Sequence, residues 1–63
     1  MRLRISVTVG EKTHSLDIQS PDSIESIKTQ IYGQLETQRF VKIPYTNAIY
    51  RCEIVDRVTV QEW

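Results

Sequence analysis

Apolar and polar positions alternate along residues 2–9 of the chain. The apolar positions are Leu3, Ile5, Val7 and Val9, and the polar ones between them are Arg2, Arg4, Ser6 and Thr8. A period of two places the two sets on opposite faces of a β-strand, so this segment predicts a strand that buries one face only. Residues 13–19 alternate in the same way, and Gly10 with the two residues after it predicts a tight turn between the strands. The hairpin therefore presents one apolar face that needs a cover.

A helix over residues 23–32 is predicted to provide that cover. Its apolar positions recur at helical spacing and are Ile24, Ile27, Ile31 and, beyond them, Leu35. Asp22 or Ser23 is expected to cap the first amides, and Asp22 with Glu25 has the spacing of a capping box. Gly33 is expected to end the helix, because glycine readily adopts the left-handed conformation found at helix ends.

Shorter elements are predicted for the second half of the chain. Residues 34–38 indicate a polar loop, residues 40–45 a third strand, residues 46–47 a turn and residues 57–62 a closing strand. Between them we expect a short return strand at residues 48–50 and a turn or single helical turn at residues 51–56. Alternation in the third strand turns Val41, Ile43 and Tyr45 toward one side.

The chain has 63 residues, which predicts a single domain over residues 1–63 with one small core. Eight basic and eight acidic side chains cancel to a formal charge of zero, so long-range attraction to nucleic acid or to an acidic membrane is not favoured. No apolar run approaches the roughly 20 residues that cross a bilayer, and Met1 leads directly into strand residues without a signal peptide. A single cysteine excludes an internal disulfide. These features predict an unprocessed cytoplasmic protein.

The candidate chemical groups are few and far apart in the sequence. His14 is the only histidine and is expected to be partly buried at the rim of the covered face, and Cys52 is expected to be a half-buried structural cysteine. One histidine and one distant cysteine do not make a metal site, and two isolated glycines do not make a phosphate-binding loop. Asp22 and Glu25 are explained by the helix start. We therefore expect no catalytic residue, no metal and no cofactor, and a chain that is not an enzyme.

The amino-terminal half of the chain resembles the ubiquitin-like (β-grasp) family. The likeness lies in the opening Met1, the glycine-containing turn, the Thr-x-x-Leu-x-Ile pattern of residues 13–18, the Pro-Asp-Ser-Ile-Glu of residues 21–25 and the Gln-Arg-Phe-Val-Lys-Ile of residues 38–43. The resemblance implies an α+β fold of order ββαβ(β)β, with a mixed sheet whose first and last strands are parallel and central, and one helix packed on one face. It also implies that Phe40 turns inward, whereas alternation turns Val41 inward, so the register of residues 40–45 stays open.

Two activities of that family are not expected for this chain. Ubiquitin-like modifiers and sulfur carriers end in Gly-Gly, whereas residues 60–63 are Val-Gln-Glu-Trp. The iron–sulfur ferredoxins that share the fold need four cysteines, and one is present. What the resemblance implies instead is an interaction surface on the helix-free face of the sheet.

Four side chains form the candidate protein-binding site, namely Arg4, Phe40, Lys42 and Arg57. If the last strand lies between the first and third, these residues form one basic patch around an aromatic side chain, and the alternative is an ordinary solvated face. We expect a small non-catalytic interaction module (adaptor, inhibitor or accessory factor) that binds a protein partner through this face or through an edge strand. The alternatives are a small structural or regulatory subunit of a larger complex, a homodimer formed through an exposed edge, or nucleic-acid binding through an Arg/Lys stripe that also includes Arg2.

Overall fold

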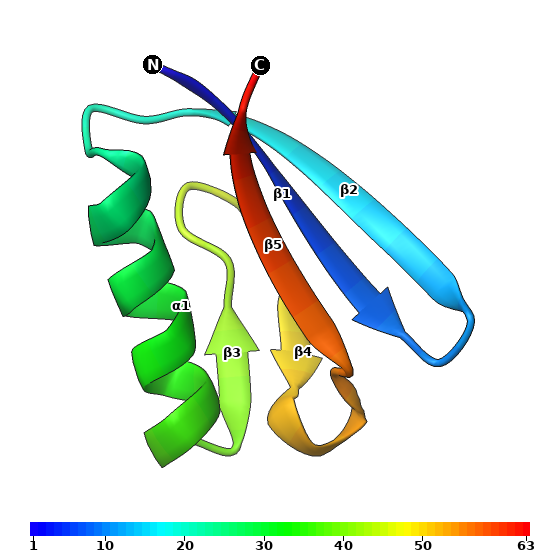
Figure 1. The fold of residues 1–63 in the computed structure, drawn as a ribbon. Helices are drawn as coiled ribbons and strands as arrows, with labels where there is room; N and C mark the ends of the chain where they lie inside the picture. Colours follow the sequence, from blue (N-terminus) through cyan, green and yellow to red (C-terminus); the bar gives the residue numbers. More distant parts are fainter.

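The computed structural model of residues 1–63 contains five β-strands, one α-helix and one short 3-10 helix (Figure 1). In chain order these are β1 (Arg2–Val9), β2 (Lys12–Gln19), α1 (Ile24–Thr37), β3 (Phe40–Lys42), β4 (Ile49–Arg51), η1 (Cys52–Ile54) and β5 (Arg57–Glu62). The strands form two sheets. One has the order β2-β1-β5, and the other is a two-stranded ribbon of β3 and β4. The α+β class is therefore as predicted.

The direction of the last strand differs from what the resemblance implies. β5 runs antiparallel to β1, with Thr8 opposite Arg57 at one end and Leu3 opposite Glu62 at the other. Every other strand pair is antiparallel as well, and β3 pairs with β4 instead of β5. The expected mixed sheet with parallel first and last strands is therefore wrong.

Asp56 gives a physical reason for this direction. Its backbone N–H donates to the carbonyl oxygen of Thr8 at 2.8 Å, and its carboxylate accepts from the N–H of Gly10 at 2.7 Å. Both contacts lie at the end of β1 where the hairpin turns. Because the chain is fixed there just before β5 begins, β5 starts where β1 ends and runs back along it.

One apolar core lies between the β2-β1-β5 sheet and the elements that cover it. Its buried members are Leu3, Ile5, Val7, Ile18, Ile27, Ile31, Val41, Ile43, Val58 and Val60. The predicted alternation of β1 and the helical stripe at Ile27 and Ile31 are confirmed. β4 lies on the same side of the sheet as the core, since its Tyr50 ring is 6.2 Å from the ring of His14 on β2.

The helix begins as predicted but ends four to five residues later than expected. Ser23 is the N-cap, and its hydroxyl accepts from the N–H of Ser26 at 3.2 Å. The capping box between Asp22 and Glu25 is therefore wrong. At the other end, α1 continues through Gly33 to Thr37, so the polar loop expected at residues 34–38 is mostly helical. The half-buried Leu35 packs against the core and explains why the helix continues.

Replacing Gly33 by alanine is expected to stabilise the fold by about 0.5–1 kcal/mol, because glycine in a helix interior costs about that much relative to alanine. A Cβ atom at Gly33 meets nothing within 4 Å. Gly10 provides the control, because its φ of 63° is left-handed and alanine there should destabilise instead. Urea denaturation of both variants measures whether each substitution raises or lowers the free energy of unfolding. A destabilised Gly33→Ala chain would contradict the helical assignment at this position.

The third strand follows the alternation and not the resemblance. Val41 and Ile43 are fully buried, whereas Phe40 is 54% exposed. The strand ends at Lys42, before Pro44, and the chain then turns over residues 43–46. Tyr45 is exposed with a φ of 63°, so the expectation that it lies on the inward side is wrong.

That turn explains the position of Tyr45. Proline at the first central position and a positive φ at the second are features of a type II turn, and the N–H of Thr46 donates to the carbonyl oxygen of Ile43 at 3.3 Å. The Tyr45 hydroxyl donates to the Asp22 carboxylate at 2.7 Å, and this bond raises the pKa of the Tyr45 phenol above its ordinary value. The turn is thereby connected to the start of α1.

Candidate functional site

The four predicted site residues lie on two different sheets. Arg4 and Arg57 belong to β1 and β5 and point away from the core, as do the other even positions of β1 and odd positions of β5. Phe40 and Lys42 belong to the outward side of the β3-β4 ribbon. The single patch required β5 to lie between β1 and β3, and β3 does not pair with β5. The structure therefore brings Phe40 and Lys42 together and leaves Arg4 and Arg57 elsewhere.

Arg4 is already engaged within the chain. Its Nε donates to Oδ1 of Asp17 at 2.8 Å and its guanidinium lies 4.9 Å from the centre of the Trp63 ring. The hydrogen bond from Arg4 holds the pKa of the Asp17 carboxyl below its ordinary value, and the same bond raises the pKa of Arg4. Arg2 also lies near Trp63, at 5.7 Å from the ring centre. The predicted Arg/Lys stripe is thus divided between two sheets and partly neutralised.

The outward side of the β3-β4 ribbon, called here the ribbon face, carries Phe40, Lys42, Ile49 and Arg51. Phe40 lies opposite Arg51 and Lys42 lies opposite Ile49, so the two apolar side chains sit on one diagonal and the two cations on the other. Phe40 is 54% exposed and Ile49 is 59% exposed. Ile49 and Arg51 were not predicted as site residues. The return strand was expected at residues 48–50, and Ile-Tyr-Arg does not alternate apolar with polar residues, so the outward side of Ile49 and Arg51 follows only from their pairing with β3.

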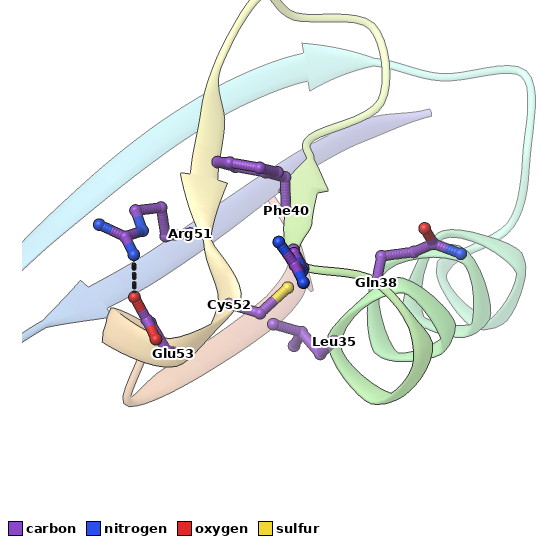
Figure 2. Close-up of a pocket in the computed structure, with 7 residues that line it drawn as sticks. Leu35, Gln38, Phe40, Arg51, Cys52 and Glu53 are labelled. Atoms are coloured by element: carbon purple, nitrogen blue, oxygen red, sulfur yellow. Dashed lines mark ion pairs between the residues drawn. The ribbon is translucent and has the colours of Figure 1, made fainter.

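An open pocket of about 660 Å³ adjoins one end of the ribbon face, between the ribbon and the last turn of α1 (Figure 2). It is lined by Leu35, Gln38, Arg39, Phe40, Arg51, Cys52 and Glu53. Figure 2 shows Phe40 extending over β4, while Cys52 and Leu35 point toward one another. The half-buried Cys52, whose burial is as predicted, donates its thiol hydrogen to the carbonyl oxygen of Gln34 at 3.7 Å.

The Gln34 side chain fixes the ribbon against the helix. Its Oε1 accepts from the N–H of Lys42 at 2.9 Å, and its Nε2 donates to the carbonyl oxygen of Lys42 at 3.1 Å. The side-chain amide thus makes the two hydrogen bonds that a neighbouring strand would make. This pairing holds β3 in place and orients the ribbon face away from the core.

The ribbon face and its pocket carry three basic side chains, Arg39, Lys42 and Arg51, and one acidic side chain, Glu53, although the whole chain has a formal charge of zero. Three ion pairs are present, and they join Arg4 to Asp17, Lys28 to Glu25 and Arg51 to Glu53. Arg39 and Lys42 take part in none of them. Two cations without an internal partner therefore lie beside the exposed Phe40.

The remaining candidate groups stay apart. His14 is exposed, so its expected partial burial is wrong, and its neighbour is the Tyr50 ring. No group of three histidine, cysteine, aspartate or glutamate side chains is placed to hold a metal ion. The one α-helix is 14 residues long, and it is neither long nor apolar enough to cross a membrane.

No known protein family matches the chain, and neither a curated protein nor a solved structure is significantly similar to it.

Proposed function

We propose that this chain is a small non-catalytic protein-interaction module that binds an acidic segment of a partner protein on its ribbon face. The observation that carries the proposal is the exposure of Phe40 and Ile49 beside cations that have no internal partner. Exposed apolar side chains next to arginine are the usual composition of an energetic centre in a protein interface.

The chemistry of the partner follows from the arrangement of the ribbon face. A large apolar side chain of the partner gains contact area on the Phe40–Ile49 diagonal. Carboxylates next to it meet Arg39 and Lys42, whose charges are not neutralised within the chain. The pocket beside Phe40 gives one partner side chain a concave place to enter. An acidic segment that carries at least one aromatic or large aliphatic residue therefore fits best.

Nucleic-acid binding through the same surface is less well supported. Ile49 offers no stacking surface, Phe40 is the only aromatic side chain of the ribbon face, and the Glu53 carboxylate lines the pocket. Non-specific binding to single strands depends on a continuous basic groove and repeated aromatic platforms. A protein segment with both apolar and acidic side chains complements this apolar and cationic surface better than a nucleic acid does.

Selection from a displayed library of random peptides on the immobilised chain tests the proposal. We expect the recovered peptides to be net acidic and to contain a large apolar residue, and we expect their affinity to fall with added salt. Arg39→Glu should weaken the best peptide by about tenfold or more, since it places a like charge opposite the acidic residues. The matched variant Arg57→Glu, on the other sheet, should change it by less than about twofold.

Two results would contradict the proposal. One is a set of selected peptides without acidic bias. The other is a single-stranded oligonucleotide that binds more tightly than any selected peptide and loses affinity in Arg39→Glu.

A further inference from the structure

The outer edge of β2 is left open, whereas two other strand edges are engaged by side chains of α1. Gln34 pairs with both backbone groups of Lys42 on β3, and the Tyr32 hydroxyl donates to the carbonyl oxygen of Val58 on β5 at 3.1 Å. β2 pairs with β1 alone. It runs for eight residues without proline, glycine or an interruption of its register, so it lacks the prolines and bulges that blunt many edge strands, and its charged side chains are Lys12 and Asp17.

The backbone groups that face outward can be assigned from the hydrogen bonds of β1. Met1 and Ser20 exchange hydrogen bonds, which places the odd positions of β1 in bonding contact with β2. Hydrogen-bonded and non-bonded pairs alternate along an antiparallel ladder. The outward N–H and C=O groups of β2 are therefore those of Thr13, Ser15, Asp17 and Gln19.

We propose that this edge pairs antiparallel with β2 of a second copy of the chain, which joins two three-stranded sheets into one of six strands. A two-fold axis through the interface requires residues of the same face to lie opposite one another. The preferred register sets Leu16 opposite Leu16 of the second copy. Ser15 then lies opposite Asp17, and Thr13 lies opposite Gln19.

The charges along β2 and its turn, together with the position of Leu16, select this register. An axis at Asp17 places two aspartates opposite each other, and an axis at His14 places Glu11 opposite Asp17, which like-charge repulsion disfavours. An axis at Ser15 or at Leu16 avoids such pairs. The axis at Leu16 also brings two half-buried leucines together in a non-bonded pair, where side chains are closest. In this register no two like charges lie opposite each other. Each copy has a formal charge of zero, so net charge adds no repulsion between the copies.

Sedimentation equilibrium from micromolar to millimolar concentration, combined with amide hydrogen exchange, tests the dimer. We expect a mass that rises toward that of two chains. As it rises, the amides of Ser15 and Asp17 should become protected, while those of His14 and Leu16 are protected at all concentrations. A chain that stays monomeric over this range, with Ser15 and Asp17 always unprotected, overturns the proposal. Protection of these amides only when a different protein strand is added overturns it as well.

Two substitutions at Ser15 distinguish the contribution of its backbone N–H to dimerisation from that of its side chain. Ser15→Pro removes an outward N–H and should weaken dimerisation by about tenfold or more, because both copies lose a hydrogen bond. Ser15→Ala keeps the N–H and should leave the dissociation constant within about twofold. Equal effects of both variants overturn the proposal. If Ser15→Pro does not fold, the exchange pattern of the unmodified chain decides alone. Phe40→Ala should leave the dimer unchanged, which keeps this result independent of peptide binding.

Discussion

Replacing Ile5 by alanine is expected to leave a large fraction of the chain unfolded at room temperature. Ile5 is fully buried at the centre of β1, where it lies opposite Leu16 on one side and Val60 on the other. Truncating a buried isoleucine to alanine costs about 2–5 kcal/mol, because the transfer energy of the lost methyl groups is combined with that of the cavity they leave. A core this small supplies roughly 3–5 kcal/mol of total stability, so the loss is comparable to the whole.

Far-UV circular dichroism during urea titration measures this effect, and Ile49→Ala is its matched control. Ile49 is also an isoleucine in a β-strand, but it is 59% exposed. Its truncation should change the free energy of unfolding by no more than about 0.5 kcal/mol. If both variants were destabilised equally, the distinction between the core and the ribbon face would be wrong.

The amino-terminal hairpin was predictable because its signals are local. A period of two fixes which side chains of β1 are buried, and the turn at Gly10 fixes the register that follows. The observed turn has two residues, Gly10 and Glu11, one fewer than the predicted turn of residues 10–12, and counting back from it places Arg4 directly opposite Asp17. The ion pair that neutralises Arg4 depends on this one-residue difference in the turn, which is why the predicted basic patch included Arg4 without its partner.

The end of the helix was not predictable from Gly33 alone. Glycine ends helices when the chain must adopt a left-handed conformation, yet in this fold Leu35 gains contact with the core if the helix continues. Burial of that side chain outweighs a propensity cost of about 1 kcal/mol. Tertiary packing therefore decides where the helix ends, and the local sequence pattern around Gly33 does not reveal that packing.

The direction of β5 depends on contacts between residues far apart in the sequence. The carboxylate of Asp56 reaches the N–H of Gly10 across 46 positions, and nothing in either segment indicates this pairing. The resemblance to the ubiquitin-like family covered mainly the first half of the chain. It therefore described the hairpin and the helix well but gave the wrong direction for the last strand.

Part of the candidate site could be predicted from the local pattern, and the rest depends on contacts between residues far apart in the sequence. Alternation alone places Phe40 and Lys42 on one outward side of β3. Their combination with Ile49 depends on the register of the ribbon, which is set by the turn at residues 43–46. Their separation from Arg57 depends on Gln34, which occupies the edge of β3 where β5 was expected.

Replacing Phe40 by alanine is expected to weaken binding of a selected acidic peptide by about thirtyfold, equivalent to about 2 kcal/mol. Phe40 supplies the largest apolar side chain of the ribbon face and one wall of the adjoining pocket, so its truncation removes contact area at the centre of the proposed interface. Titration of the labelled peptide by fluorescence anisotropy measures the loss. Lys42→Ala should have a smaller effect in the same direction, because it removes an exposed charge and an alkyl stem with less contact area than the Phe40 ring.

Trp63→Ala is the matched control, since Trp63 is 53% exposed and Phe40 is 54% exposed. Trp63 lies beside Arg2 and Arg4 on the other sheet, so its truncation should leave peptide affinity within about twofold. Arg4→Ala and Arg57→Ala should behave in the same way. Strong losses in the Trp63, Arg4 and Arg57 variants with none in Phe40→Ala would instead place the binding surface on the outward face of the β2-β1-β5 sheet. This set of variants therefore decides which of the two sheets meets the partner, because each sheet carries one exposed aromatic side chain with cations beside it.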